Sequence, residues 1–395
     1  MMHIDRIADK EQPRMISGID EWDRVIGGGI VPGSLMILTG DPGIGKSTLL
    51  LQLGNQIARN YRVFYFSTEE SLQQIKLRAK RLTCTNNQLL FCDNASLDTI
   101  IATAEQEKPD LLIIDSIQNC YLSSSTSSPG SIAALRELTF RLMRLAKEHT
   151  IATLMSGHIT KEGMIAGPKT LEHMVDAVFY LQGEDQLQTR VLRSVKNRFG
   201  TINELGFFQM HVEGLTQVPN INQHLMNELT HAPGSILVSV MEGSRPLLLE
   251  LQTLVIESKL SMPQRIVSGI DHKQVILIAA ILEKYLQVRF SMHDIFFKVS
   301  GGFKIIGSSA DLGIALALLS SYFQKPLPEK SIALGEIGLT GHIKSINHMT
   351  MYAKEAATFG IRQLLIANNQ ALENASCNVQ RFKNVYDLLD IFVQS

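Results

Sequence analysis

The sequence predicts an α/β protein with two domains in tandem. Over roughly the first 215 residues, apolar runs typical of buried strands alternate with helical patterns, which favours a parallel sheet covered on both faces. The stretch Gly214–Pro233 interrupts this alternation, and the same kind of alternation resumes after it. We therefore expect one domain over residues 1–215, a linker over 216–232 and a second domain over 233–395.

The expected elements follow the chain in order. In the first domain, strands are expected over 34–39, 62–67, 111–115, 151–156, 177–181 and 189–195, with a helix over 46–59. In the second domain, strands are expected over 235–241, 247–255, 295–298, 331–335, 343–345 and 363–367. Helical patterns there cover 273–285, 311–323 and 352–359.

Composition excludes several classes of protein. The 395 residues include 37 Lys and Arg against 38 Asp and Glu, with 45% hydrophobic and 19% charged residues. These values exclude a disordered or fibrous chain and binding to nucleic acid through overall basicity. No apolar run reaches the roughly 18–20 residues of a membrane span, and the N-terminus lacks the apolar core of a secretory signal. No two of the four cysteines have C-x-x-C spacing, so we expect a reducing cytoplasm rather than a disulfide or zinc framework.

A phosphate-binding motif links the first expected strand to the first helix. Residues 40–47 read G-D-P-G-I-G-K-S, which matches G-x-x-x-x-G-K-[ST] in the strand–turn–helix context that this pattern requires. In such a P-loop, backbone N–H groups point at phosphate, Lys46 reaches the β- and γ-phosphates, and Ser47 ligates Mg²⁺. We therefore expect ATP and Mg²⁺ as ligands. The expected nucleotide-binding residues are Gly40, Asp41, Pro42, Gly43, Ile44, Gly45, Lys46, Ser47 and Thr48.

Two expected strands end in acidic residues that could serve this phosphate site. Asp115 closes the run L-L-I-I-D, where a carboxylate can hold Mg²⁺ or its water, although Asp also caps helices. Glu69 and Glu70 follow the strand over 62–67, where a carboxylate can position the water that attacks the γ-phosphate. Either glutamate could instead cap the next helix or face solvent. We assign Mg²⁺ binding to Asp115 with Ser47, and catalysis to Glu69 with Glu70 as the alternative.

A basic cluster lies near the end of the first domain. Residues 189–200 read T-R-V-L-R-S-V-K-N-R-F-G, and the cations are Arg190, Arg193, Lys196 and Arg198. Such a cluster is commonly a solvated face or an anion-binding patch. In a P-loop ATPase, Lys196 and Arg198 could also reach the γ-phosphate held by a neighbouring subunit, as arginine fingers do. That interpretation requires an oligomer.

Motifs beyond the P-loop resemble the bacterial RadA/Sms family of RecA-superfamily ATPases. K-N-R-F-G at 196–200 and G-H-I-T-K-E-G at 157–163 are the most specific of these motifs. Further matching stretches lie at 17–34, 67–71, 129–137, 157–176, 242–252 and 335–341. The resemblance covers almost the whole chain. It implies an α/β fold with a RecA-like P-loop ATPase core and a C-terminal Lon-protease-like domain.

The resemblance also implies a function. The chain would form a homo-oligomeric, hexameric ring that binds single-stranded DNA and drives branch migration of recombination intermediates in homologous recombination and DNA repair. Recombinase or replication proteins would be its partners. By the same resemblance, His158 is the γ-phosphate sensor, and Lys196 and Arg198 act in trans. The DNA-binding loops correspond to 121–130 and 159–169, with expected contacts from Lys161, Gly163, Gly167 and Lys169.

The chain departs from the family pattern in some places. We expect it to lack the four-cysteine zinc ribbon with which the family usually begins, and Ala134 replaces a common glutamine. In the second domain, the Lon protease pattern puts Asp311 at the nucleophile position and Thr350 at the lysine position. We therefore expect a non-proteolytic scaffold rather than an ATP-dependent protease. Two alternatives stay open: a DNA-binding ring that needs ATP only to assemble, and a KaiC-like regulatory ATPase.

Overall fold

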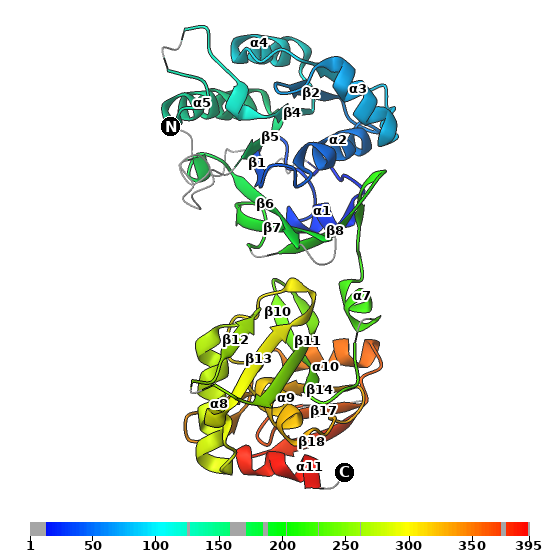
Figure 1. Ribbon diagram of the computed structural model, residues 1–395. Coiled ribbons are helices and arrows are strands. Elements are labelled where there is room, and N and C mark those ends of the chain that lie inside the picture. Colours follow the sequence, from blue (N-terminus) through cyan, green and yellow to red (C-terminus); the bar gives the residue numbers. More distant parts are fainter. Residues whose placement is uncertain are drawn as a thin grey trace, which may run out of the picture. The chain divides into compact units, whose positions relative to one another are not determined.

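The computed structural model describes residues 13–124, 127–158, 171–184, 189–202, 204–227, 229–260, 262–372 and 377–393. These residues form two compact units, one that ends at residue 219 and one that begins at residue 220. Each unit has its own sheet and its own helices (Figure 1). Among the described residues, no helix combines the length and the apolar character that a bilayer crossing needs.

The first unit is built on a sheet of nine described strands. Their order is β3 (Leu89–Cys92), β2 (Val63–Ser67), β4 (Leu111–Asp115), β5 (Ala152–His158), β1 (Leu35–Gly40), β6 (Ala177–Glu184), β7 (Thr189–Asn197), β8 (Leu205–His211) and β9 (Gly214–Gln217). From β3 through β6 in this order the strands run parallel, and β7 to β9 extend the sheet in antiparallel fashion. The carboxyl ends of β1, β2, β4 and β5 therefore meet at one edge.

Helices cover both faces of this sheet (Figure 1). One face carries α1 (Asp20–Val25), α2 (Lys46–Ile57) and α3 (Leu72–Arg81), and the other carries α4 (Leu97–Glu107) and α5 (Ile132–His149). Along β1, Met36 and Leu38 point into the core with α2, whereas Leu35 and Ile37 point into the core with α5. Burial of one such side chain contributes about 1.5–3 kcal/mol. Both faces of the strand are thus stabilised, which explains the uninterrupted apolar runs.

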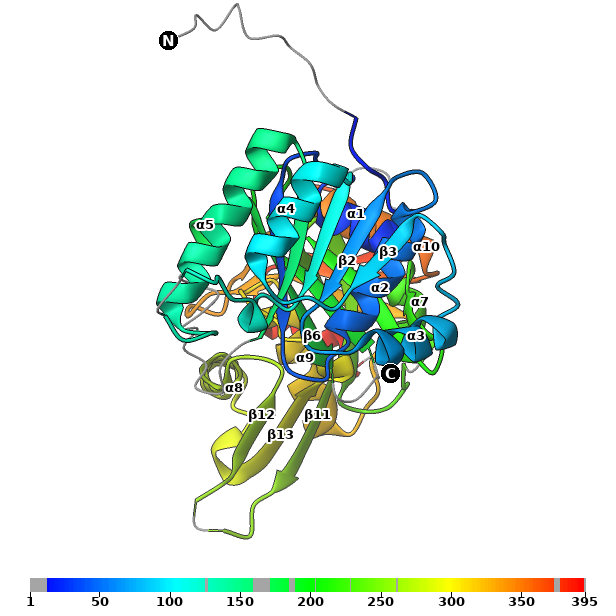
Figure 2. The same ribbon diagram turned by 90° about the horizontal axis from the view of Figure 1, so that it is seen from above.

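The second unit holds a mixed sheet of seven described strands. Their order is β12 (Arg265–Ser268), β13 (His293–Val299), β11 (Arg245–Glu257), β10 (Ser235–Glu242), β14 (Ser331–Leu334), β17 (Gln363–Ala367) and β18 (Asn378–Phe382). A separate ladder joins β15 (Glu336–Ile337) to β16 (Ile343–Lys344). The helices are α7 (Ile221–Asn227), α8 (His272–Leu286), α9 (Asp311–Phe323), α10 (Met349–Thr358) and α11 (Asp390–Val393). Figure 2 shows β11, β13 and β12 side by side, with α8 next to β12.

Most elements lie where the sequence predicts them. The strands over 111–115 and 363–367 and the helix over 311–323 have the expected bounds. The stretch 216–232, which we expected to be a linker, holds regular structure. It contains the end of β9 and the whole of α7.

Polar side chains anchor both of these elements. The side-chain amide of Gln52 donates to the Leu215 carbonyl oxygen at 3.1 Å and accepts from the Leu215 N–H at 2.9 Å. The Asn222 amide donates to the carbonyl oxygen of Pro246 at 2.8 Å and accepts from the N–H of Leu248 at 2.9 Å. Contacts of this kind leave no periodic pattern of hydrophobic residues in the sequence. The stretch therefore has the sequence pattern of a linker.

Candidate active site

The loop between β1 and α2 has the backbone of a phosphate site. Gly40 and Gly45 have φ angles of 153° and 114°, which side-chain-bearing residues rarely adopt. A Cβ atom on Gly40 would lie 2.3 Å from the carbonyl oxygen of Leu181, and one on Gly45 would lie 2.6 Å from the terminal carbon of Met210. Helix α2 begins directly after this turn, at Lys46. Its first-turn N–H groups have no helical acceptor and are available to an anion at the loop.

Lys46 lies over this loop. Its ammonium donates to the carbonyl oxygens of Gly40 at 2.9 Å and Asp41 at 3.0 Å, and its side chain is buried. Burial lowers the pKa of Lys46, and three nearby carboxylates act against that shift: those of Asp115, Glu69 and Asp41. The ammonium therefore sits between the phosphate loop and the acidic strand ends.

Asp115 ends β4 at the same edge and is 7% exposed. The Tyr65 hydroxyl donates to its Oδ2 at 2.7 Å, and the Ser156 hydroxyl donates to its Oδ1 at 2.5 Å. Burial, followed by the negative charge of Asp115, raises the pKa of Tyr65, so the phenol stays a proton donor. Both donors are neutral and therefore orient the carboxylate without neutralising it. The Asp115 carboxylate is thus held in one orientation with its charge retained.

The two glutamates after β2 have different partners. Glu69 is exposed and accepts a hydrogen bond from the Ser116 hydroxyl. Glu70 forms an ion pair with Arg78 of α3. Thr68, just before them, donates its hydroxyl to the carbonyl oxygen of Ser116 at 2.7 Å, which ties this turn to the end of β4. Glu69 therefore stays beside the phosphate loop, whereas Glu70 is directed towards α3.

The strand register places His158 at the same edge. β1 and β5 pair in parallel, and Gly40 is paired with His158, the last residue of β5. The backbone of His158 therefore lies next to the start of the P-loop. The expected DNA contacts Lys161, Gly163, Gly167 and Lys169 lie outside the described residues.

Lys196 and Arg198 lie at the opposite edge of the sheet. β7 runs antiparallel to β6, so Arg190 near its start pairs with Gly183 on the P-loop side, and Asn197 at its end pairs with the first residue of β6. A strand of this length spans roughly 25 Å. Neither cation can therefore reach the phosphate loop of its own chain.

The surroundings of these two cations differ. The Lys196 ammonium donates to the carbonyl oxygens of Glu172 at 2.5 Å and Val175 at 2.9 Å. Burial, followed by repulsion from Arg198, lowers the pKa of Lys196. The Arg198 side chain is 60% exposed and pairs with Asp176 at 3.3 Å. Arg198 is thus open to solvent, while the Lys196 ammonium is held by the carbonyl oxygens of Glu172 and Val175.

Sequence reasoning missed several residues that hold the phosphate edge. Tyr65 and Ser156 orient Asp115, and their only signal is a hydroxyl within an otherwise apolar strand. Arg190, assigned above only to the basic cluster, donates its Nε to the carbonyl oxygen of Ile44 at 3.2 Å. The antiparallel hairpin thus contacts the P-loop directly.

At one sheet edge, a phosphate loop, a buried lysine, an oriented carboxylate and an exposed carboxylate come together, which is the set that phosphoryl transfer to water requires. Three curated proteins named DNA repair protein RadA are similar to this chain. This chain is 44% identical to the Listeria monocytogenes protein, and the match covers 93% of this chain and 80% of the relative. It is 42% identical to the Bacillus subtilis protein, with 92% of this chain and 80% of the relative covered. It is 40% identical to the Pseudomonas aeruginosa protein, with 95% of this chain and 83% of the relative covered. The chain belongs to the RadA family of DNA repair proteins.

Two family models match parts of this RadA family member. The model described as AAA domain matches residues 13–164, and the model described as subunit ChlI of Mg-chelatase matches residues 270–370. Family membership and these matches confirm the predicted fold class, a RecA-like P-loop ATPase core followed by a Lon-like α/β domain. The chain is a P-loop ATPase. Among solved structures, the RadB recombinase is 21% identical, with a TM-score of 0.42 over 52% of this chain and 99% of its own.

The second unit of this RadA family member has a buried acid at the position considered for a protease nucleophile. Asp311 begins α9 and is 5% exposed. Its carboxylate accepts from the Gln274 amide at 2.7 Å and from the backbone N–H of Ile337 at 3.1 Å. Burial raises the pKa of Asp311 to about 6. Thr350, at the position considered for a lysine, is exposed on α10. Asp311 therefore connects α9 to β15 rather than presenting a nucleophile.

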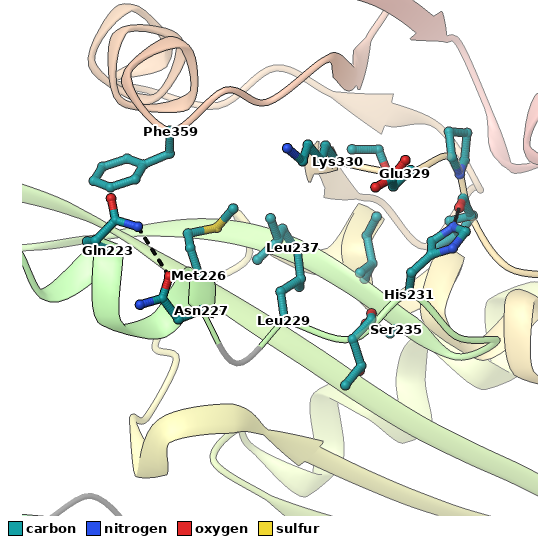
Figure 3. A pocket seen from close by; sticks show the side chains of 15 residues that line it. Gln223, Met226, Asn227, Leu229, His231, Ser235, Leu237, Glu329, Lys330 and Phe359 are labelled. Carbon is teal, nitrogen blue, oxygen red and sulfur yellow. Dashed lines mark hydrogen bonds between the residues drawn. The ribbon is translucent and has the colours of Figure 1, made fainter.

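A cavity of about 310 Å³ also lies in the second unit (Figure 3). Its lining comes from α7 and the residues 229–231 that follow it, from β10, from the loop before β14 and from Phe359 after α10. Figure 3 shows Met226, Leu229 and Leu237 towards the floor, with Lys330 and Glu329 facing them from the loop. The lining contains no phosphate-binding motif. Within the described ranges, no group of three or more His, Cys, Asp or Glu side chains is placed to hold a metal ion.

Proposed function

We propose that the chain is an ATP-driven motor that binds single-stranded DNA and promotes branch migration of recombination intermediates in homologous recombination and DNA repair. The names of its relatives, DNA repair proteins, support the repair role. One observation carries the motor mechanism: the phosphate loop and the pair Lys196 and Arg198 lie at opposite edges of one sheet. A subunit built in this way completes the site of a neighbour rather than its own.

Hydrolysis would use the residues of the phosphate edge. Glu69 would hold the attacking water in line with the γ-phosphate, because its carboxylate is exposed beside the loop. Lys46 would exchange the loop carbonyls for phosphate oxygens, and the first turn of α2 would add N–H donors. His158 would contact the γ-phosphate from the end of β5, where its backbone pairs with Gly40.

A magnesium ion fits the donors at this edge. Mg²⁺ prefers hard oxygen ligands, and the Ser47 hydroxyl and the Asp115 carboxylate are of this kind. The hydroxyl donors on Asp115 fix its direction and leave its charge available. When bound, Mg²⁺ would offset the negative charge of the phosphates, with Ser47 and Asp115 as the residues that hold it.

Assembly would bring the far edge of one subunit to the phosphate edge of the next. A head-to-tail interface of this kind closes into a ring when its rotation allows, and we propose a hexamer. Arg198 is accessible to such a neighbour, because most of its side chain is exposed. A cation supplied in trans stabilises the charge of the transition state, so hydrolysis would depend on the assembled ring.

Single-stranded DNA would bind at the loops over 121–130 and 159–169. Lys161 and Lys169 would contact phosphates, with support from the N–H groups of Gly163 and Gly167. The second loop follows β5 directly in the sequence, and the last residue of β5 pairs with the first residue of the P-loop. This adjacency supports a link between the nucleotide and the DNA.

The test measures ATP hydrolysis and branch migration with and without single-stranded DNA, for the native chain and for Glu69→Gln. The motor proposal expects DNA to stimulate hydrolysis, and Glu69→Gln to lower kcat about 10²-fold and to slow migration to the same extent while ATP and DNA still bind. A Glu69→Gln variant that still moves DNA at the native rate would favour a ring that needs ATP only to assemble. Turnover with no response to DNA would favour a regulatory ATPase instead.

A further inference from the structure

One buried carboxylate, that of Asp176, holds the far edge of the sheet. Asp176 precedes β6 and is 5% exposed. Its Oδ1 accepts from the Arg198 guanidinium at 3.3 Å, and its backbone carbonyl oxygen accepts from the N–H of Arg198 at 3.1 Å. Its Oδ2 accepts from the Lys147 ammonium at 2.8 Å and from the backbone N–H of Leu35 at 3.0 Å. Asp176 thus engages Arg198 through both its backbone and its side chain.

The remaining contacts make Asp176 a fixed anchor. Leu35 is the first residue of β1, the strand that leads into the P-loop, and Lys147 lies on α5. A buried carboxylate that accepts from a strand, a helix and a neighbouring arginine has little freedom to turn. The position of its Oδ1 is therefore set by the central strand of the unit.

Arg198 is far more exposed than Asp176. Its side chain is 60% exposed, and a long arginine side chain on a surface samples many rotamers. The guanidinium carries five N–H donors in a planar fork, and the contact with Asp176 uses Nη1. The carboxylate can therefore restrict the direction of the guanidinium and still leave donors for a second anion.

We propose that Asp176 is a positioning residue for ATP hydrolysis, which holds Arg198 in the orientation that meets the γ-phosphate bound by the neighbouring subunit. The inference rests on the trans-acting role of Arg198 proposed above. In this role Asp176 acts through Arg198 and not through a contact of its own with the nucleotide. It reduces the conformations that Arg198 gives up when the neighbour docks, and pre-oriented donors stabilise transition-state charge better than mobile ones.

A double-mutant cycle on ATP hydrolysis tests this inference. Asp176→Asn keeps the size of the side chain and one acceptor oxygen but removes the charge. It should lower kcat about tenfold with the KM for ATP unchanged, whereas Arg198→Ala should lower kcat about 10³-fold. In the Arg198→Ala background, Asp176→Asn should cause no further loss, because Asp176 acts through Arg198.

Arg144→Gln is the matched control. It breaks an exposed ion pair with Glu148 on α5 and leaves every contact of Asp176 in place, so kcat should change by less than about twofold. The cycle is repeated with Asp176→Glu, which keeps the charge and displaces it by one methylene. This second variant keeps the test valid if Asp176→Asn does not fold.

The outcomes separate the inference from the proposed function. An equal loss from the Asp176 substitution in both backgrounds would assign Asp176 a purely structural role and overturn the inference. No loss from it, together with a large loss from Arg198→Ala, would leave the trans role standing and reject the positioning role. No effect of Arg198→Ala would reject both.

Discussion

The two edges of the first sheet orient their acidic side chains in different ways. At the phosphate edge, Asp115 is held by the neutral hydroxyls of Tyr65 and Ser156. At the far edge, Asp176 is held by two cations, Lys147 and Arg198. Asp115 ends β4 and Asp176 precedes β6, and both are buried. Burial alone therefore does not explain why one has neutral partners and the other has charged partners.

The proposed function accounts for this contrast, because it gives the two edges different roles. A metal ligand needs direction without loss of charge, and neutral donors supply that. An arginine that acts on a neighbouring subunit must be both oriented and exposed. A buried carboxylate can orient the guanidinium and still leave most of the arginine side chain in solvent. Under the proposed function, each edge holds half of a site, and a complete site needs two chains.

Lys46→Ala should have the largest effect at the phosphate edge. It removes the buried ammonium that lies over the loop, so kcat/KM for ATP should fall about 10³-fold and nucleotide binding should weaken. Steady-state kinetics and binding of a fluorescent nucleotide measure the two effects. Lys76→Ala, on the exposed side of α3, is the control and should behave as the native chain. An active Lys46→Ala variant would show that phosphate binds elsewhere.

The paired glutamates allow a matched comparison at the same edge. Glu69→Gln should lower kcat about 10²-fold, because a general base or water-positioning group is lost. Glu70→Gln breaks an ion pair with Arg78 and should change kcat by less than about threefold. Single-turnover hydrolysis with bound ATP separates these rates from product release. The reverse order of effects would assign catalysis to Glu70.

Tyr65→Phe should have a smaller effect on kcat and a clear effect on the magnesium requirement. It removes one of the two hydroxyl donors from Asp115 and keeps the ring. The Mg²⁺ concentration for half-maximal hydrolysis should rise about tenfold, since the ligand is then less well oriented. Ser156→Ala should shift the titration in the same direction. Unchanged titrations for both variants would argue against Asp115 as the metal ligand.

Which parts of the phosphate site can be predicted from the sequence depends on how far apart in the chain the contacting residues lie. The P-loop is one contiguous motif, and the apolar runs before Asp115 and Glu69 already mark them as strand ends. The hydroxyls that orient Asp115 come from other strands, 50 and 41 residues away, and no local pattern points to them. Those contacts are visible only once the strand order is known.

The direction of a strand also could not be predicted from the sequence pattern. The pattern over 189–195 predicts a strand, but not that it runs antiparallel to β6 and carries Lys196 and Arg198 to the far edge. The helix α7 within 216–232 was not expected from the sequence, because it is anchored by polar contacts such as that of Asn222 with the Pro246 carbonyl. The roles of His158, Lys161 and Lys169, and the domain boundaries, stay predictions.

The smallest expected effect concerns the stability of the second unit. Burial raises the pKa of Asp311 from 3.8 to about 6. The folded chain therefore binds this proton more tightly than the unfolded chain, so the stabilising contribution is complete below about pH 3.8 and is lost as pH rises through about 6. Relative to Asp311→Asn, which cannot ionise, the native chain should lose about 1–3 kcal/mol of unfolding free energy between pH 4 and pH 7.

Hydrogen exchange of the α9 amides at several pH values measures this difference locally. Native and variant profiles that run parallel between pH 4 and pH 7 would show that Asp311 does not titrate with folding. The activity of the phosphate edge serves as the control, and it should be the same for both proteins at pH 7.

Completion of each ATP site by a neighbouring chain is tested most directly by mixing two inactive variants. Lys46→Ala keeps Arg198 but lacks a working phosphate loop, and Arg198→Ala has the reverse defect. In a randomly mixed ring, about one interface in four joins an intact loop to an intact arginine. The mixture should therefore regain up to about a quarter of native hydrolysis while each variant alone stays inactive. Mixed rings, verified by native mass spectrometry, that stay inactive at every ratio would contradict completion in trans.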